Sequence, residues 1–229
     1  MPKDIVKQDL KTLAIVLRRT NYGEADRILN LITPVGKISA IAKGVRRPKS
    51  KLAGGVEMFT LSELQIHLGR SELGVITSAK MQKFFGNILQ DFDRMEVMGE
   101  ILKQVGKAAE HTDSSEWFDI TRQVMTELNN GAEVELVRSW FGLNYLRISG
   151  EEVNLYRDVL GEKLVEDKRY NWSVADTAFI PNERGEFGVN EIKMLRLMTT
   201  TKLTVAKRVK ITEETQKRIS ELVQICVKQ

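Results

Sequence analysis

The spacing of apolar residues changes partway along this chain of 229 residues, from a strand-like to a helix-like period. Over residues 11–81 apolar side chains alternate in short runs rich in β-branched residues, which is typical of β-strands. After Lys83 they recur three and four positions apart, as at Met95, Met98 and Leu102, which is typical of one face of a helix. The chain is therefore predicted to be an α+β protein, with an all-β part followed by an α-helical part.

Five strands are expected in the all-β part, at about residues 13–17, 28–32, 38–43, 59–68 and 73–79. The turn Thr33–Gly36 closes the second run, because proline fixes φ and glycine accepts an open backbone. In the fourth run Leu61 lies out of phase with Leu64, which predicts a β-bulge near Ser62. Five short strands with a glycine-rich connection predict a small closed barrel rather than a doubly wound sheet.

Helices are expected in the second part, at about residues 86–110, 113–129, 132–148, 190–199 and from 212 onward. Asp113 with Glu116 resembles a capping box, and Asn190 and Thr212 are expected as N-caps. The shift in composition near residue 84 predicts a domain boundary there. The expected domains are therefore a barrel over residues 1–82 and a helical domain over residues 83–229, with a cysteine-free subdomain at 155–190.

Positive charge is concentrated in the all-β part. Residues 28–56 carry six Lys or Arg and no Asp or Glu, and residues 1–80 have a net charge of +7 while the whole chain has +4. Such asymmetry is typical of a basic binding domain joined to another part. Gly44 and Pro48 keep the most basic segment, residues 43–51, out of a helix, so that its side chains reach toward phosphates. Nucleic acid is the predicted partner, and a solubilising surface loop is the alternative.

Contact with phosphates is predicted to dominate over stacking on bases. Residues 1–80 contain only two aromatic side chains, Tyr22 and Phe59, whereas barrels that grip single strands usually offer several. Weak sequence preference and binding of both single and double strands follow, with a log–log salt slope of about −3 to −4 on single strands if about four to six phosphates are neutralised. The predicted DNA-binding residues are Arg18, Arg19, Lys37, Lys43, Arg46, Arg47, Lys49, Lys51 and Arg70.

The sequence carries no signature of an enzyme. His67 and His111 lie in different predicted parts without a nucleophile, and neither a phosphate-binding loop nor a dinucleotide fingerprint is present. The one cysteine, Cys226, allows no internal disulfide and no multi-cysteine metal site, and it is expected to be a buried thiol. No apolar leader or membrane-spanning run is found, so a cytoplasmic, nucleoid-associated location is predicted. Because catalytic and metal-binding motifs are also missing, the protein is predicted to be non-enzymatic and to bind neither a cofactor nor a metal.

Four blocks of sequence lie in and around the basic stretch, namely Tyr22–Leu29, Thr33–Lys37, Ala42–Ser50 and Phe59–Leu64. In order and spacing they resemble the N-terminal domain of the bacterial RecO family. The resemblance implies an OB-fold, which is a five-stranded β-barrel, followed by an α-helical domain. It further implies a mediator of recombinational DNA repair that binds single- and double-stranded DNA and anneals complementary strands. With RecR, such a protein helps load RecA onto strands coated by single-strand-binding protein.

One departure from the family concerns zinc. Many RecO-like sequences carry two cysteine pairs in the helical domain, at a spacing that suits tetrahedral Zn²⁺. Here Arg157 and Leu160 stand where the first pair would be, and the later segment, residues 179–188, also lacks thiols. No zinc site is therefore predicted. The subdomain is expected to be held instead by packing of Tyr156, Trp172, Phe179 and Phe187.

Some alternatives stay open at the level of sequence. An RNA-binding OB-fold module in translation or RNA processing would have similar charge and fold, and a scaffold that binds acidic proteins is a further reading. Arg27 is expected to be mainly structural, and Glu24 or Asp26 is expected to pair with it or with an arginine of a neighbouring strand. Candidates for binding the acidic tail of single-strand-binding protein are Arg138 and Arg147, or Lys207, Arg208 and Lys210.

Overall fold

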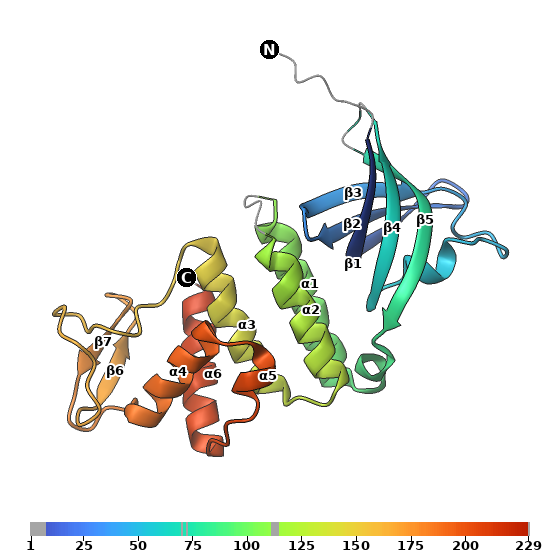
Figure 1. Cartoon of the computed structure of the whole chain (residues 1–229). Coiled ribbons are helices and arrows are strands. Elements are labelled where there is room, and N and C mark those ends of the chain that lie inside the picture. Colours follow the sequence, from blue (N-terminus) through green and yellow to red (C-terminus); the bar gives the residue numbers. More distant parts are fainter. Residues whose placement is uncertain (1–7, 70, 72, 111–114, 229) are drawn as a thin grey trace, which may run out of the picture. The chain divides into compact units, whose positions relative to one another are not determined.

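The computed structural model describes residues 8–69, 71, 73–110 and 115–228 (Figure 1). The chain forms two compact units, Met1–Asn129 and Asn130–Gln229. The first unit contains the strands of a barrel and two helices, and the second contains the remaining helices and a small two-stranded sheet.

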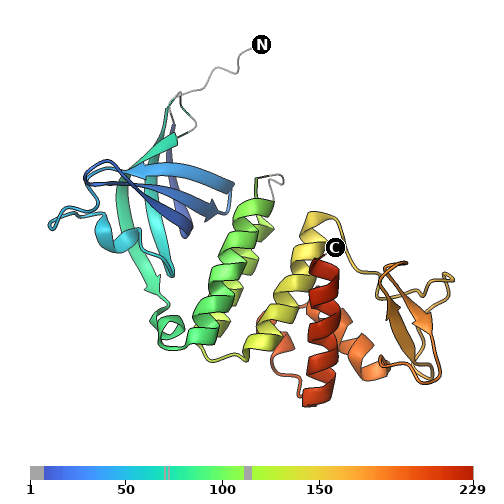
Figure 2. The ribbon, with the colours of Figure 1, turned by 180° about the vertical axis from the view of Figure 1, so that it is seen from behind.

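Five strands close into a barrel in the first unit, as the sequence predicts (Figures 1 and 2). The order around the barrel is β1-β2-β3-β5-β4, and antiparallel pairing of β1 with β4 closes it. Strand β3 pairs in parallel with β5, while the other neighbours are antiparallel. The strands are β1 (Gln8–Tyr22), β2 (Asp26–Thr33), β3 (Gly36–Ala42), β4 (Thr60–Leu68) and β5 (Leu73–Phe84).

The barrel is filled by aliphatic side chains from alternate positions of the strands, among them Val16, Leu29 and Ile66. The pairing of β4 with β5 is irregular between Leu61 and Ser62, at the place where the sequence predicts a bulge. The extra residue lies in β5 rather than in β4, because Thr60, Ser62, Leu64 and Ile66 keep one inward phase. The irregularities lie in β5, since Leu61 pairs with Lys83 but Ser62 with Met81, and Gln65 pairs with Ser78 but Ile66 with Ile76. Two small hydroxyl side chains, Thr60 and Ser62, occupy inward positions where the sequence pattern expects apolar ones.

Two helices, α1 (Phe92–Ala108) and α2 (Glu116–Asn129), complete the first unit. A short 3₁₀ helix, η2 (Gly86–Gln90), leads from β5 into α1, whose N-cap Asp91 accepts a hydrogen bond from the Arg94 N–H at 3.1 Å. Helix α1 packs against β1, and α2 packs against β1 and β2. The compact unit therefore extends past the predicted boundary at residue 82, which lies inside β5, and includes both helices. Asp113, predicted to begin the second helix, lies outside the described residues.

The second unit is built on packing of α3 (Val134–Ser149) against α4 (Val189–Thr200) and α6 (Glu213–Val227), with the short helix α5 (Leu203–Ala206) beside them. Gly142 allows the close approach of α3 to α6, because a Cβ there would lie 2.4 Å from Val223 Cγ1. Helix α3 ends at Gly150, which has a φ of 84°.

The N-caps of the last two long helices differ in how well the sequence predicts them. Thr212 caps α6 as predicted, accepting the Thr215 N–H at 3.1 Å. The N-cap of α4 is Gly188 rather than the predicted Asn190, and Glu191 Oε2 accepts the Gly188 N–H at 3.0 Å. A glycine has no capping side chain, so the sequence rule for N-caps misses it.

The cysteine-free subdomain carries the hairpin β6 (Tyr170–Ser173) and β7 (Ala178–Pro181). Phe179 contacts the rings of Tyr170, Trp172 and Phe187 edge-on, with centroid distances of 6.3, 5.1 and 5.5 Å. The predicted aromatic packing is thus found for three residues, but Tyr156 is 54% exposed and lies over Arg196 instead. Tyr170, which the sequence analysis leaves out, takes its place in this core.

Hydrogen bonds hold the turn at residues 157–162, which contains Arg157 and Leu160. Asp158 Oδ1 accepts the N–H groups of Leu160 and Glu162 at 2.9 and 3.0 Å, and Arg157 donates to the Gly161 carbonyl at 2.7 Å. Across the described part of the chain, no group of three or more His, Cys, Asp or Glu side chains could hold a metal ion.

Two further sequence predictions can be compared with the structure. Cys226 is a free, buried thiol, and its burial raises its pKa to about 11. Of the helices in the described residues, none is long and apolar enough to cross a membrane.

Candidate nucleic-acid interface

Residues 43–51, the basic loop, follow β3 and lead toward the 3₁₀ helix η1 (Ala53–Gly55). Figures 1 and 2 show the connection between β3 and β4 standing out from the barrel wall. The side chains of Lys43, Arg47, Lys49 and Lys51 are exposed. Among the described residues, none of these four side chains has a hydrogen-bonding or ion-pairing partner. Their charges are therefore available to an external anion.

The start of the basic loop is fastened to the turn between β1 and β2. Asp26 Oδ1 accepts the Gly44 N–H at 2.7 Å, and the Ala25 carbonyl accepts the Arg46 N–H at 2.9 Å. The Arg46 guanidinium donates to the carbonyl of Gly23 at 2.7 Å and also to that of Glu24. Arg46, predicted as a DNA contact, thus holds the loop in place. This attachment lowers the conformational freedom that the free cations would lose on binding.

Glu57 lies near the end of the connection between β3 and β4 and pairs with two arginines. Its Oε1 accepts from Arg27 Nη1 at 2.8 Å, and its Oε2 forms an ion pair with Arg19. Arg27 also donates through Nε to Asn21 Oδ1 at 3.3 Å. Partial burial lowers the pKa of Arg27, and the nearby charges of Arg19 and Arg46 lower it further. The carboxylate that pairs with Arg27 is therefore that of Glu57, and not that of Glu24 or Asp26 as predicted.

Of the other predicted DNA-binding residues, Arg18 is exposed, Lys37 has internal partners and Arg70 is not described. Arg18 is exposed on β1, just after an irregularity between Val16 and Arg18 in the pairing with β2. Lys37 is turned away from the basic loop, because its Nζ donates to the Gly106 carbonyl at 2.9 Å and to Glu110 at 2.6 Å. Arg70 lies outside the described residues.

Sequence reasoning misses two cations on β5. Lys80 and Lys83 are exposed on this strand, and Lys83 Nζ lies 4.9 Å from the centre of the Phe85 ring. Helix η1 packs against β5, since a Cβ on Gly55 would lie 2.7 Å from Ala79 Cβ. The connection that carries the basic loop therefore returns beside Lys80. The signal in the sequence is two lysines within a strand, which by itself indicates only an exposed face.

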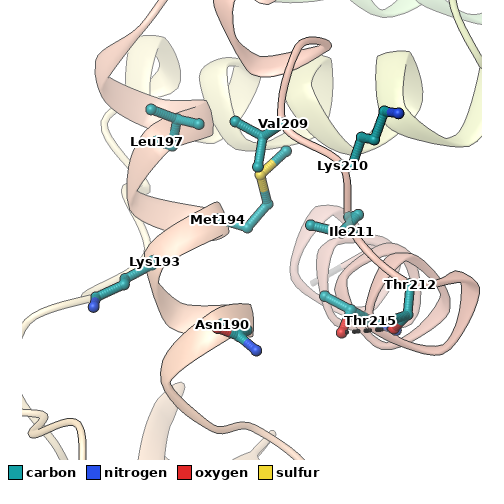
Figure 3. Close-up of a pocket in the computed structure, with 9 residues that line it drawn as sticks. All are labelled: Asn190, Lys193, Met194, Leu197, Val209, Lys210, Ile211, Thr212 and Thr215. Carbon is teal, nitrogen blue, oxygen red and sulfur yellow. Dashed lines mark hydrogen bonds between the residues drawn. The ribbon is translucent and has the colours of Figure 1, made fainter.

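A separate groove lies in the second unit, between α4 and the segment that precedes α6 (Figure 3). Its volume is about 450 Å³. Met194 and Val209 point into the groove in Figure 3, while Lys193 points outward and pairs with Glu166 at 2.6 Å. Lys210 at the rim is exposed and, within the described residues, has no ion-pair partner. The groove is lined by Asn190, Lys193, Met194, Leu197, Val209, Lys210, Ile211, Thr212 and Thr215.

Two protein-family models and several named relatives match most of this chain. The model of the recombination protein O N-terminal domain matches residues 8–85, and that of the recombination protein O C-terminal domain matches residues 89–229. A DNA repair protein RecO of Dehalococcoides mccartyi strain CBDB1 is 32% identical over 216 residues, which cover 90% of this chain and 84% of that protein. A DNA repair protein RecO of Roseiflexus sp. strain RS-1 is 27% identical over 220 residues, which cover 93% and 77%.

Proposed function

Because this chain belongs to the RecO family of non-enzymatic DNA repair proteins, we propose that it is a recombination mediator that binds DNA through the basic loop. In this proposal it binds single and double strands, anneals complementary strands and, with RecR, helps load RecA onto strands coated by single-strand-binding protein. The observation that carries the proposal is the fastened loop, which presents Lys43, Arg47, Lys49 and Lys51 without partners in the described part of the chain.

The mechanism follows from where the charge lies. Lysine and arginine side chains that neutralise phosphates release the counterions of the strand, so that binding depends on salt rather than on sequence. The exposed cations of β1 and the basic loop add up to a local charge that lowers the repulsion between two strands. Complementary bases then pair while both backbones are held.

The groove between α4 and residues 209–212 is the proposed site for the acidic tail of single-strand-binding protein. Its apolar floor, with Met194 and Leu197, would take apolar side chains, and Lys210 at the rim would take a carboxylate. Of the predicted tail-binding residues, Lys210 is the one that lines this groove. We expect Lys210→Glu to weaken binding of a labelled tail peptide, whereas Lys168→Glu, at an exposed position outside the groove, should not. Equal effects of the two would place the tail elsewhere.

A competition experiment tests DNA against the alternative of RNA. A labelled single-stranded DNA is bound to the protein at fixed salt, and unlabelled DNA or RNA of the same sequence is added. Since the contacts are to phosphates, we expect DNA to displace the probe at least as well as RNA does. RNA that displaces the probe at a much lower concentration would contradict the assignment to DNA and favour a role in RNA processing.

A further inference from the structure

Two arginines, Arg19 and Arg27, converge on the carboxylate of Glu57 beside the basic loop, and a third, Arg46, lies nearby. Arg19 and Arg27 each contact one oxygen of Glu57, and Arg46 lies close enough that its charge lowers the pKa of Arg27. The side chains of Arg19 and Glu57 are each 40% exposed, and that of Arg27 is 20% exposed. The cluster is thus open to solvent and keeps a net positive charge after Glu57 is counted.

Glu57 is the one acidic residue in the connection over residues 43–59. It is placed as an anionic ligand would be, with each of its two oxygens on a different guanidinium group. A phosphodiester also offers two acceptor oxygens, and arginine binds carboxylates and phosphates with the same donor geometry. The guanidinium groups are already oriented, Arg27 by Asn21 and Arg46 by the carbonyls of Gly23 and Glu24.

We propose that Arg19 and Arg27 form a further phosphate site, and that Glu57 occupies this site until a DNA phosphate displaces it. The inference rests on the proposed function, because it assumes that the basic loop brings a DNA strand to the barrel. Glu57 then acts as an internal competitor that limits the affinity for DNA. The phosphate bound there would lie next to those bound by the free cations of the basic loop.

The surroundings of Glu57 allow this exchange with little movement of the backbone. Val56, the preceding residue, is fully buried in the barrel core, and the Glu57 carbonyl accepts a hydrogen bond from Thr60 Oγ1 at 2.7 Å. The backbone is therefore fixed on both sides of the residue. Only the half-exposed side chain must rotate away from the arginines to admit a phosphate.

The expected effects follow from the salt dependence of binding to single strands. One phosphate contact contributes about 0.7 to the log–log slope, which corresponds to about fivefold in affinity at ~0.1 M salt. Glu57→Gln removes the competing charge and keeps the shape, so we expect DNA to bind up to about fivefold more tightly at ~0.1 M salt. Arg19→Gln should weaken binding by about fivefold and make the slope shallower by about 0.7.

The test measures the affinity of a labelled oligo-dT across salt for the wild-type protein, Glu57→Gln, Arg19→Gln and the double variant. Glu63→Gln is the matched control, because Glu63 lies on the same barrel, pairs with Lys11 at 3.1 Å and is 36% exposed. It changes the net charge by the same amount at a distance from Arg19 and Arg27. We expect the gain to be large in Glu57→Gln, small in Glu63→Gln and absent when Arg19→Gln is also present.

The outcomes separate this inference from the proposed function. If the wild-type protein does not bind oligo-dT, the proposed function fails. If it binds, but Glu57→Gln and Glu63→Gln give equal gains, net charge alone explains the effect and the phosphate site is refuted. A gain that persists in the double variant refutes it as well. A large fall in the melting temperature of Glu57→Gln would show that the ion pairs serve stability, which also overturns the inference.

Discussion

Replacing Arg47, Lys49 and Lys51 by glutamine should remove most of the affinity for DNA without unfolding the barrel. These side chains, with Arg18 and Lys43, are the five exposed cations of the predicted set that have no partner in the described part of the chain. At about 0.7 per phosphate, these five contacts contribute about −3.5 to the log–log slope on single strands. Losing three should make the slope shallower by about 2.1 and weaken binding by about 100-fold at ~0.1 M salt.

Fluorescence anisotropy of a labelled oligo-dT, titrated at several salt concentrations, measures both quantities. A matched control replaces three exposed lysines of the second unit, Lys163, Lys168 and Lys217, by glutamine and thereby removes the same net charge. The control should keep nearly the wild-type slope, since none of its three lysines belongs to the basic loop. A triple loop variant with an unchanged slope would refute the assignment of the phosphate contacts to the basic loop. Thermal unfolding should show both variants to be folded, because none of the replaced loop side chains forms a hydrogen bond or ion pair with the described residues.

Three further predictions concern the second unit. The N–H of Gly188 and the hydroxyl of Thr215 hold the pKa of Glu191 below its ordinary value, even though burial alone would raise it. The contribution of ionised Glu191 to stability should therefore be complete above about pH 4.3 and be lost as the pH falls through the lowered pKa. Glu191→Gln should lower the free energy of unfolding, measured with denaturant at neutral pH, by about 1–2 kcal/mol. Cys226 should react slowly with a thiol reagent at pH 8 until the chain is unfolded, because its pKa is raised to about 11; rapid reaction of the native protein would contradict this. Chelation by EDTA should leave the melting curve unchanged, and stoichiometric zinc in the purified protein would refute the metal-free account of the subdomain.

The sequence predicts the strands and helices of this fold well where apolar residues recur with one constant spacing. The five strands and the long helices follow from runs of apolar residues whose spacing leaves one interpretation. The sequence predicts the irregularity at the right place along β4 but assigns the extra residue to the wrong strand, because Thr60 and Ser62 point inward and hydroxyl side chains look like solvent-facing positions. The N-cap at Gly188 has no sequence signal of its own, since the hydrogen-bonding partner of its N–H is the side chain of Glu191 three residues later.

The sequence predicts where the candidate site lies, but not which of its cations are free and which have internal partners. A run of cations indicates a basic surface, yet all cations in it look alike in the sequence. The structure separates Arg46, which holds the turn between β1 and β2, and Lys37, which binds the end of α1, from the free side chains of the loop. It also adds Glu57, which lies 30 residues from Arg27 and 38 from Arg19 in the sequence. Such pairings depend on tertiary structure, so no local pattern reveals them.

Strand annealing tests the central claim most directly. Two complementary single strands, free or coated with single-strand-binding protein, are mixed with the wild-type protein or with the triple loop variant over a range of salt. The account predicts that the wild-type protein accelerates annealing of both, that the acceleration falls steeply as salt rises, and that the triple loop variant loses it. Annealing that the variant supports as well as the wild-type protein does, or that salt leaves unchanged, would contradict the account.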